Sequence, residues 1–482
     1  MVGPGLAAAV VLATLAVFAW VGFRVRARDL DVEDYMIARN TQRAVSLGAS
    51  FLASGLGAWI LFAPPEIGAS VGVVAVVGYA IGAATPVVCF GILGRRMRAV
   101  VPAGHSLSEF IRVRYGRGFH AFVVAVSVAY MLLFLTAELT AVGAVAGILS
   151  TIDPRVAVLA VAAVTLAYTA YGGLRASLRT DRWQAWFILG LLAAGVVAVA
   201  VVAPPAPGRV AETGLLTLDA GGFEVAVALI IAVTVANLFH QGYWQRVWAA
   251  ADARTLARGA WGGAVLIVPA VALVGGIGIV AAAHGLELGD PPAPLFALVA
   301  ELPVWVGVAV LVLAVALVAS SVDTLENGLA SLVAAERPTL PLSGARVLTA
   351  LLVVPAVAIA LQGHSVLRLF LIADLLCAAI VVPALLGLWS RATTTGALAG
   401  GLAGLAGAVA PGWLATGSLG TGLWLATFPD AVPTLPPFAW ALGASAVVTI
   451  GTSLASRRST DLSAVGAEVE RRTAAQRGDP RP

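Results

Sequence analysis

Repeated apolar segments of bilayer length limit most strongly what this chain can fold into. A helix that crosses a membrane needs roughly 20 predominantly apolar residues, and thirteen such runs follow one another along the 482 residues. Only 11% of the residues are charged, against roughly a quarter in a soluble domain. The sequence therefore predicts an all-α polytopic membrane protein with about 13 transmembrane helices. Their approximate bounds are 5–23, 44–63, 70–93, 119–148, 155–171, 184–203, 223–245, 260–283, 297–333, 346–362, 368–390, 395–412 and 434–455.

The arginines predict how these spans are oriented. The chain contains no lysine, and with the N-terminus placed outside, all but three of its 29 basic residues fall on the cytoplasmic side. The exceptions are Arg155, Arg209 and Arg368. Because basic residues concentrate in cytoplasmic loops, we predict a multi-pass protein of the cell inner (plasma) membrane with its C-terminus in the cytoplasm. The first span lacks a preceding basic region, so we expect it to be retained and not cleaved as a signal peptide.

Several function classes are disfavoured by the same sequence. The net charge of +4 comes from arginines that are distributed as membrane topology requires, so it does not indicate a nucleic-acid partner. Cys89 and Cys377 lie within apolar runs and predict no disulfide, metal site or redox role. We find no metal-binding His/Glu pair, nucleophile elbow or carboxylate dyad, so we expect neither an enzyme nor an organic cofactor. The expected partners are the lipid bilayer and a small-molecule solute.

A polar cluster interrupts the ninth span. Ser320, Asp323 and Thr324 are spaced i, i+3, i+4, which places them on one face of a helix, and Ser321 adjoins them. Oxygen atoms on one face suit a hard monovalent cation. Alternatively, the hydroxyls bond to the preceding turn or to a neighbouring helix. Asp323 favours the first interpretation, because a carboxylate in a membrane needs a cation, a proton or an arginine.

Two further segments indicate a polar site within the membrane. Gly55 and Gly57 in the second span weaken the helix there, and unwound carbonyls at mid-membrane can coordinate an ion. The alternative is close helix packing through small residues. The seventh span ends in the segment 237–246, where we expect Asn237, His240 and Gln241 to face a solute and Trp244 and Arg246 to lie at the membrane interface. Glu138 and Asp374 are lone carboxylates, each either a pocket residue or half of a buried pair.

Taken in order, five segments resemble the sodium/solute symporter family. The most specific is the Gly172-Gly173 loop that ends in Thr180-Asp181-x-x-Gln184. Within that family, Gln241–Arg246 and Pro102–Gly116 are similar to the urea/polyamine symporter branch. The five segments are Asp34–Arg39, Ala53–Gly68, Tyr168–Gln184, Ser320-Ser321, and Leu388–Arg391 with Gly396–Gly400.

The resemblance implies a leucine-transporter-like core of five helices repeated in inverted orientation. The implied divisions are a first helix and cytoplasmic linker (1–43), a first five-helix repeat (44–203), a second inverted repeat (223–390), two peripheral helices (395–455) and a disordered cytoplasmic tail (456–482). The implied function is sodium-coupled symport of a small polar solute, such as urea, a polyamine or an amino acid, by alternating access. Coupling to protons through Asp181 or Asp323, or a transporter-like sensor module, are the alternatives.

The resemblance also implies sites. Sodium, the implied coupling ion, would be bound by backbone carbonyls of Ala53, Leu56 and Leu317 and by the hydroxyls of Ser320 and Ser321. A second cation would lie among Asp181, Asp323 and Thr324. Proline and sugar are disfavoured as substrates, because Gly55 and Ala236 stand where the relevant relatives have an acidic residue and a gating tyrosine. The expected substrate-facing residues are Gly55, Trp59, Glu138, Asn237, His240 and Gln241.

Overall fold

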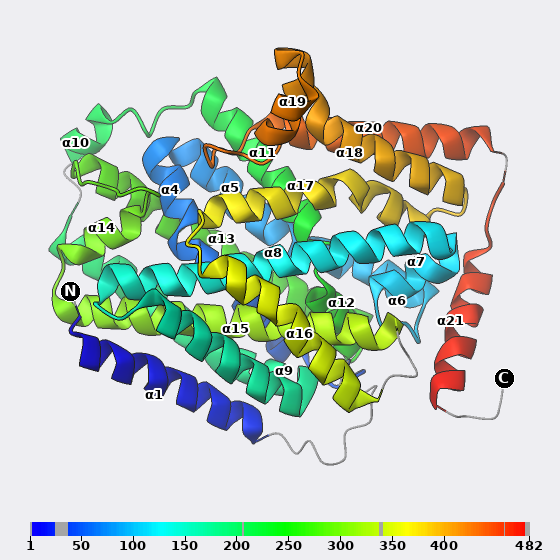
Figure 1. The fold of residues 1–482 in the computed structure, drawn as a ribbon, viewed down its shortest axis with the longest axis horizontal. Helices are drawn as coiled ribbons and strands as arrows, with labels where there is room; N and C mark the ends of the chain where they lie inside the picture. Colours follow the sequence, from blue (N-terminus) through cyan, green and yellow to red (C-terminus); the bar gives the residue numbers. More distant parts are fainter. Residues whose placement is uncertain (1, 25–36, 205–206, 337–340, 457, 478–482) are drawn as a thin grey trace.

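The computed structural model describes residues 2–24, 37–204, 207–336, 341–456 and 458–477. Within this part of the chain the long elements are all helices, and most run along the long axis of the molecule (Figure 1). Ten of them are long and apolar enough to cross a membrane, and the bent pair Ala44–Gly55 and Ala58–Ser70 makes an eleventh span. Of the segments used for the family resemblance, Asp34 and Tyr35 lie outside the described residues.

Each of the thirteen predicted runs contains helix, and the ninth run, 297–333, is divided into two helices between Ala300 and Val304. The 49-residue helix α9 covers two of them, because it bends at Gly173, whose φ of 56° and ψ of −148° are not helical. The tenth run forms the shorter helix α16. The helices are α1 Pro4–Phe23, α3 Ala44–Gly55, η1 Ala58–Leu61, α4 Ala63–Ser70, α5 Val73–Cys89, η2 Phe90–Gly94, α6 Arg95–Val100, α7 Leu107–Tyr115, α8 Arg117–Leu149, α9 Pro154–Val202, α10 Pro207–Glu212, α11 Ala220–Asn237, α12 Gln241–Ala249, α13 Ala253–Ala283, α14 Pro294–Ala300, α15 Val304–Glu336, α16 Leu342–Ala360, α17 Val366–Leu385, η3 Leu386–Leu388, α18 Thr394–Thr416, α19 Leu419–Leu425, α20 Leu435–Ala455 and α21 Leu462–Arg477.

Two membrane helices are broken midway. The first break separates α3 from η1: Leu56 leaves the helical region at φ −101° and ψ 80°, and Gly57 is extended. The second break separates α11 from α12, which begins only at Gln241. Each broken helix is the first of a group of five predicted spans, one in 44–203 and one in 223–390. The two breaks therefore occupy equivalent places in the two groups.

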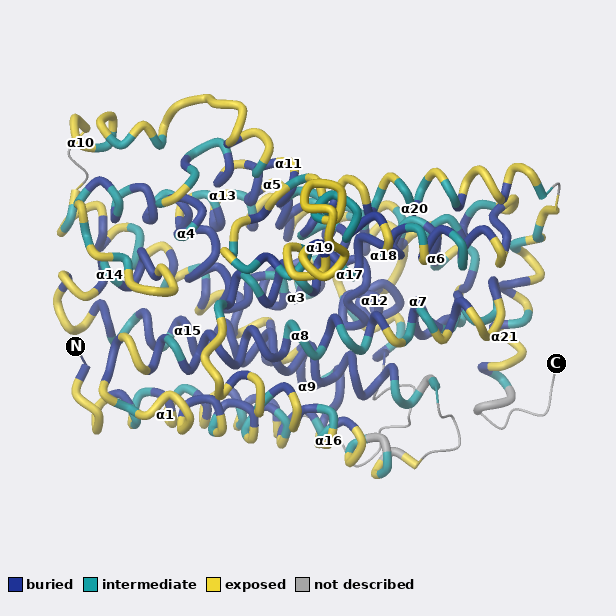
Figure 2. Tube along the Cα trace, turned by 45° about the horizontal axis from the view of Figure 1, so that its top comes forward, coloured by how far each residue is buried: buried dark blue, intermediate teal, exposed yellow. Residues whose placement is uncertain are grey.

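Helix α13 holds both halves of the first broken helix. A Cβ added at Gly278 would lie 1.9 Å from the carbonyl oxygen of Pro65, and one at Gly68 would lie 2.1 Å from that of Gly275. The backbones of α4 and α13 therefore touch, which only glycine permits at these crossings. Figure 2 shows α15 and α12 largely buried inside the molecule, whereas α10 and α19 are exposed.

The prediction of a disordered tail over 456–482 is wrong for Leu462–Arg477. This segment forms α21, which packs against α6 and α7 at the right of Figure 1. Val465 and Val469 are spaced i, i+4 and are both buried, so they give the helix an apolar face. Thr473 adds a hydrogen bond from its hydroxyl to the carbonyl of Ala103 at 3.3 Å. Residues 457 and 478–482 of the tail lie outside the described chain.

Candidate functional site

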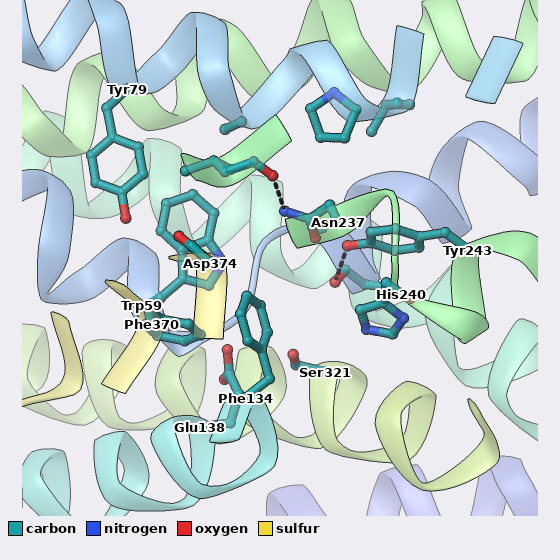
Figure 3. Close-up of a pocket in the computed structure, with 16 residues that line it drawn as sticks. Trp59, Tyr79, Phe134, Glu138, Asn237, His240, Tyr243, Ser321, Phe370 and Asp374 are labelled. Carbon is teal, nitrogen blue, oxygen red and sulfur yellow. Dashed lines mark hydrogen bonds between the residues drawn. The ribbon is translucent and has the colours of Figure 1, made fainter. Parts of the chain in front are cut away.

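A narrow pocket lies where the two helix breaks meet (Figure 3). Its volume is about 30 Å³, room for only a few water molecules, so it is narrow. Side chains from six spans close around it. They are Ser54, Gly55, Trp59, Tyr79, Ala83, Pro86, Val87, Phe134, Glu138, Val233, Asn237, His240, Tyr243, Ser321, Phe370 and Asp374.

The pocket brings together most of the residues predicted to face a solute. Gly55, Trp59, Glu138, Asn237 and His240 all line it.

Gln241 does not line this pocket, and its role in binding a solute stays a prediction. Its side-chain amide donates a hydrogen bond to the carbonyl of His105 at 3.1 Å, on the other side of α12. The chain turns at the second break, so that His240 caps α12 by accepting the N–H of Gly242 at 3.1 Å while the next side chain points away.

Aromatic rings form much of the wall of the pocket. Trp59 stacks on Tyr79 with ring centroids 5.3 Å apart, and His240 stacks on Tyr243 at 4.4 Å. The edge of one ring meets the face of the other between Phe134 and Phe370, at 4.5 Å. The hydroxyl of Tyr243 donates to the carbonyl of Ser54 at 2.9 Å, which ties α12 to the end of α3.

Glu138 on α8 closes the first break. Its Oε2 accepts the N–H of Ala58 at 2.8 Å, the first residue of η1. Gly57 leaves the room for this carboxylate, because a Cβ there would lie 1.9 Å from Glu138 Oε1. Oε1 itself has no hydrogen-bond partner among the described residues. Glu138 thus lies in the pocket and forms no ion pair within the described chain.

A buried ion pair lies beneath the pocket. The Nη2 of Arg246 is 2.8 Å from Asp181 Oδ2, and both side chains are fully buried. The same guanidinium donates to the hydroxyls of Ser50 at 2.7 Å and Ser54 at 2.6 Å, and to Thr324 at 3.1 Å.

The prediction that Arg246 and Trp244 lie at the membrane interface is therefore wrong, since neither side chain is exposed. The break after Asn237 turns α12 inward against α15, which sequence position alone does not reveal.

The residues predicted for cation binding lie around this ion pair. Ser320 donates to Asp181 Oδ1 at 2.9 Å. Asp323 accepts hydroxyl hydrogen bonds from Tyr168 at 2.7 Å, Ser177 at 2.8 Å and Thr180 at 3.1 Å, all on α9. The guanidinium of Arg246 is the positive group that lies between Asp181 and Thr324.

The predicted sodium ligands come from α3 and α15. The last helical hydrogen bond of α3 runs from the N–H of Leu56 to the carbonyl of Leu52, at 2.9 Å. The carbonyls that follow, those of Ala53 and Leu56 included, therefore lie at a helix end and have no partner within the helix. Leu317, Ser320 and Ser321 lie on the continuous helix α15, and Ser321 reaches the pocket.

Sequence reasoning missed the aromatic residues of the pocket. Tyr79, Phe134 and Phe370 line the pocket, but each occurs singly in an apolar run. Aromatic residues of an ordinary core show the same pattern. For Asp374 the sequence allows either a pocket residue or half of a buried pair, and the side chain lines the pocket. A lone acid at mid-span was the available signal.

Two curated proteins with similar sequences are transporters. The chain is 28% identical over 362 residues to the spermidine transporter DUR31 of Candida albicans, covering 74% of this chain and 70% of that protein. It is 28% identical over 103 residues to the urea active transporter of Saccharomyces cerevisiae, covering 21% of this chain and 14% of that one. No protein-family model matches the chain.

Two solved structures share the fold. A Na⁺-coupled sialic acid symporter in a substrate-bound outward-open state superposes with a TM-score of 0.75 at 14% identity, covering 94% of this chain and 99% of that one. Mhp1, a nucleobase-cation-symport-1 family transporter in a closed conformation with bromovinylhydantoin bound, gives 0.59 at 13% identity, covering 91% and 99%. This chain resembles transporters in sequence and in fold. Its leucine-transporter-like fold confirms the predicted fold class, and its apolar helices make it a multi-pass membrane protein. Membership of the sodium/solute symporter family stays a prediction.

Proposed function

We propose that the chain is a sodium-coupled symporter that moves a small nitrogenous solute, a polyamine or urea, across the cell inner membrane by alternating access. The observation that carries the proposal is the narrow polar pocket at the junction of the two helix breaks. In a membrane, irregular backbone is tolerated where it lines a cavity, and transporters bind substrate and coupling ion at such discontinuous helices. A pocket this narrow admits a solute only when the surrounding helices separate.

The pocket's charge favours amines or urea over an amino acid. Glu138 and Asp374 line it, and no arginine is among its lining residues, while the chain contains no lysine. A solute carboxylate would therefore find no cationic side chain there, because His240 accepts a hydrogen bond at Nδ1 and is a neutral imidazole. The names of the two similar proteins, a spermidine transporter and a urea active transporter, support the same class of solute.

Sodium coupling is supported by the donors beside the pocket. Carbonyl oxygens at the end of α3 and the hydroxyls of Ser320 and Ser321 are hard ligands of the kind that coordinate Na⁺ in transporters with broken helices. Both similar solved structures are of cation symporters.

Proton coupling is the second candidate, and Asp323 favours it. This buried carboxylate accepts four hydroxyl hydrogen bonds and forms no salt bridge with a described basic side chain.

Uptake into cells, with and without external sodium, tests the proposal. Ser320→Ala combined with Ser321→Ala removes two hydroxyl ligands without lowering helix propensity. The double variant should reach the membrane, and its apparent sodium affinity should fall at least tenfold, about 1.4 kcal/mol. Ser445→Ala, on the peripheral helix α20, is the matched control and should behave as the unaltered protein. If sodium dependence is the same in the double variant, sodium does not bind at this site.

A further inference from the structure

Two carboxylates face the pocket without a positive partner. Glu138 is 0% exposed and Asp374 is 4% exposed. Each has one oxygen, Glu138 Oε1 and Asp374 Oδ1, that finds no hydrogen-bond donor among the described residues. They come from different helices, α8 and α17, which pack against each other. Figure 3 shows the two side chains at separate positions around the pocket.

Neither basic side chain described nearby offers a positive charge to these acids. Arg246 directs Nε to Ser50, Nη1 to the carbonyl of Gly242 at 2.7 Å, and Nη2 to Asp181. His240 accepts the N–H of Gly242 through Nδ1. An ionised carboxylate inside a membrane is costly unless a positive charge accompanies it. Two positive groups would therefore neutralise the ionised acids of the pocket, and the described chain supplies neither.

Both acids line the pocket. The hydrogen bond from Ala58 to Glu138 Oε2 fixes that carboxylate over Gly57, where Oε1 fills the space that a Cβ would occupy. Asp374 lies in the middle of α17, between buried neighbours. The space around them is bounded by Trp59, which can bind ammonium groups over its face and methylene groups along its edge.

We propose that Glu138 and Asp374 each bind one ammonium group of a single dicationic solute, an α,ω-diamine or the diamine segment of a longer polyamine. This inference rests on the proposed transport function and names the solute class of the same pocket. The aromatic rings between the acids contact the methylene chain of the solute. The two acids thus select for two positive charges, and urea or a monoamine satisfies at most one of them.

Binding to the purified full-length protein in lipid nanodiscs tests this site. The probes are putrescine (1,4-diaminobutane), 1-aminobutane, which has the same carbon chain and one ammonium, and urea. We expect putrescine to bind at least 100-fold more tightly than 1-aminobutane. Glu138→Gln and Asp374→Asn, which keep the size of each side chain, should each reduce this preference to less than tenfold. Glu66→Gln removes a carboxylate that lines a separate cavity with Asp153 and His364, and it should keep the preference.

The outcomes separate this inference from the proposed function. Equal binding of putrescine and 1-aminobutane by the unaltered protein overturns the inference, as does sodium-driven uptake of urea without diamine binding, which leaves the proposed function intact. A Glu138→Gln variant that loses sodium dependence and keeps the diamine preference shows that Glu138 binds the coupling ion, and also overturns the inference. Diamine selectivity without sodium-driven uptake supports the site and contradicts the proposed function. Thermal unfolding of each variant by tryptophan fluorescence verifies folding, and if the amides fail to fold, Glu138→Asp and Asp374→Glu replace them, with a reduced preference expected.

Discussion

Removing either partner of the buried Arg246–Asp181 pair should destabilise the protein strongly. The two charges are 2.8 Å apart and fully buried. At an effective dielectric near 20 their attraction is about 6 kcal/mol. Much of this only offsets the cost of burying them, but a single deletion leaves the other charge unpaired, which typically costs about 3–5 kcal/mol. Asp181→Asn leaves the guanidinium without its counter-charge, and Arg246→Met leaves the carboxylate without its counter-charge.

A double-mutant cycle measures this coupling. The free energy of unfolding is followed by tryptophan fluorescence during titration with dodecyl sulfate, for the two single variants and for the double variant. We expect each single variant to lose about 3–5 kcal/mol, and the double variant to lose clearly less than the sum, because it strands no charge. Arg472→Met, which breaks an exposed pair with Glu468 on α21, is the control and should have little effect.

The reasoning fails if the cycle is additive, or if both single variants unfold within about 0.5 kcal/mol of the unaltered protein. Either result would mean that water or rearranged neighbours replace the lost partner. The pair would then not hold α12 against α9 in the way the structure indicates.

Three further predictions concern topology, the first helix break and the second cation site. Reporter fusions after Arg258 and near Gly420 should report the cytoplasm and the outer side respectively, and a reversal of either refutes the predicted orientation. Gly57→Ala should reduce uptake, because its Cβ would lie 1.9 Å from Glu138 Oε1 and would displace the carboxylate that caps the break. Gly262→Ala, with nothing within 4 Å, should transport normally, and equal uptake by both would show that the break is not held as described. Asp323→Ser should lower the cooperativity of uptake in sodium if a second cation binds beside it, or remove the pH dependence of uptake if a proton does, and no change in either would exclude both roles.

The sequence predicted the membrane helices and the first break because both depend on local properties. Runs of apolar residues set the spans, and Gly55 and Gly57 weaken a helix wherever they lie in the membrane. Trp59 lies beside that break, so its place in the pocket could be predicted from its position in the chain. Glu138 could be predicted as a pocket residue because a carboxylate at mid-span is costly to bury and usually faces a cavity or a partner inside the bundle.

The side-chain directions after the second break could not be predicted in the same way. The residues after Asn237 follow a new helix axis, so the face on which each one lies depends on the angle between α11 and α12. That angle directs Gln241 toward His105, and it directs Arg246 toward Asp181, which is 65 residues away in sequence. An arginine near the end of an apolar run has the same local pattern whether it anchors at an interface or forms a buried pair.

Accumulation of solute in liposomes under an imposed sodium gradient tests whether the chain couples solute transport to sodium. The purified protein is reconstituted, an inward sodium gradient is applied, and labelled putrescine or urea is measured inside. We predict accumulation above the external concentration that collapses when an ionophore dissipates the sodium gradient, and that requires higher sodium in the variant lacking both the Ser320 and Ser321 hydroxyls. Equal accumulation from a proton gradient in the absence of sodium, or no accumulation of either solute, would contradict the account.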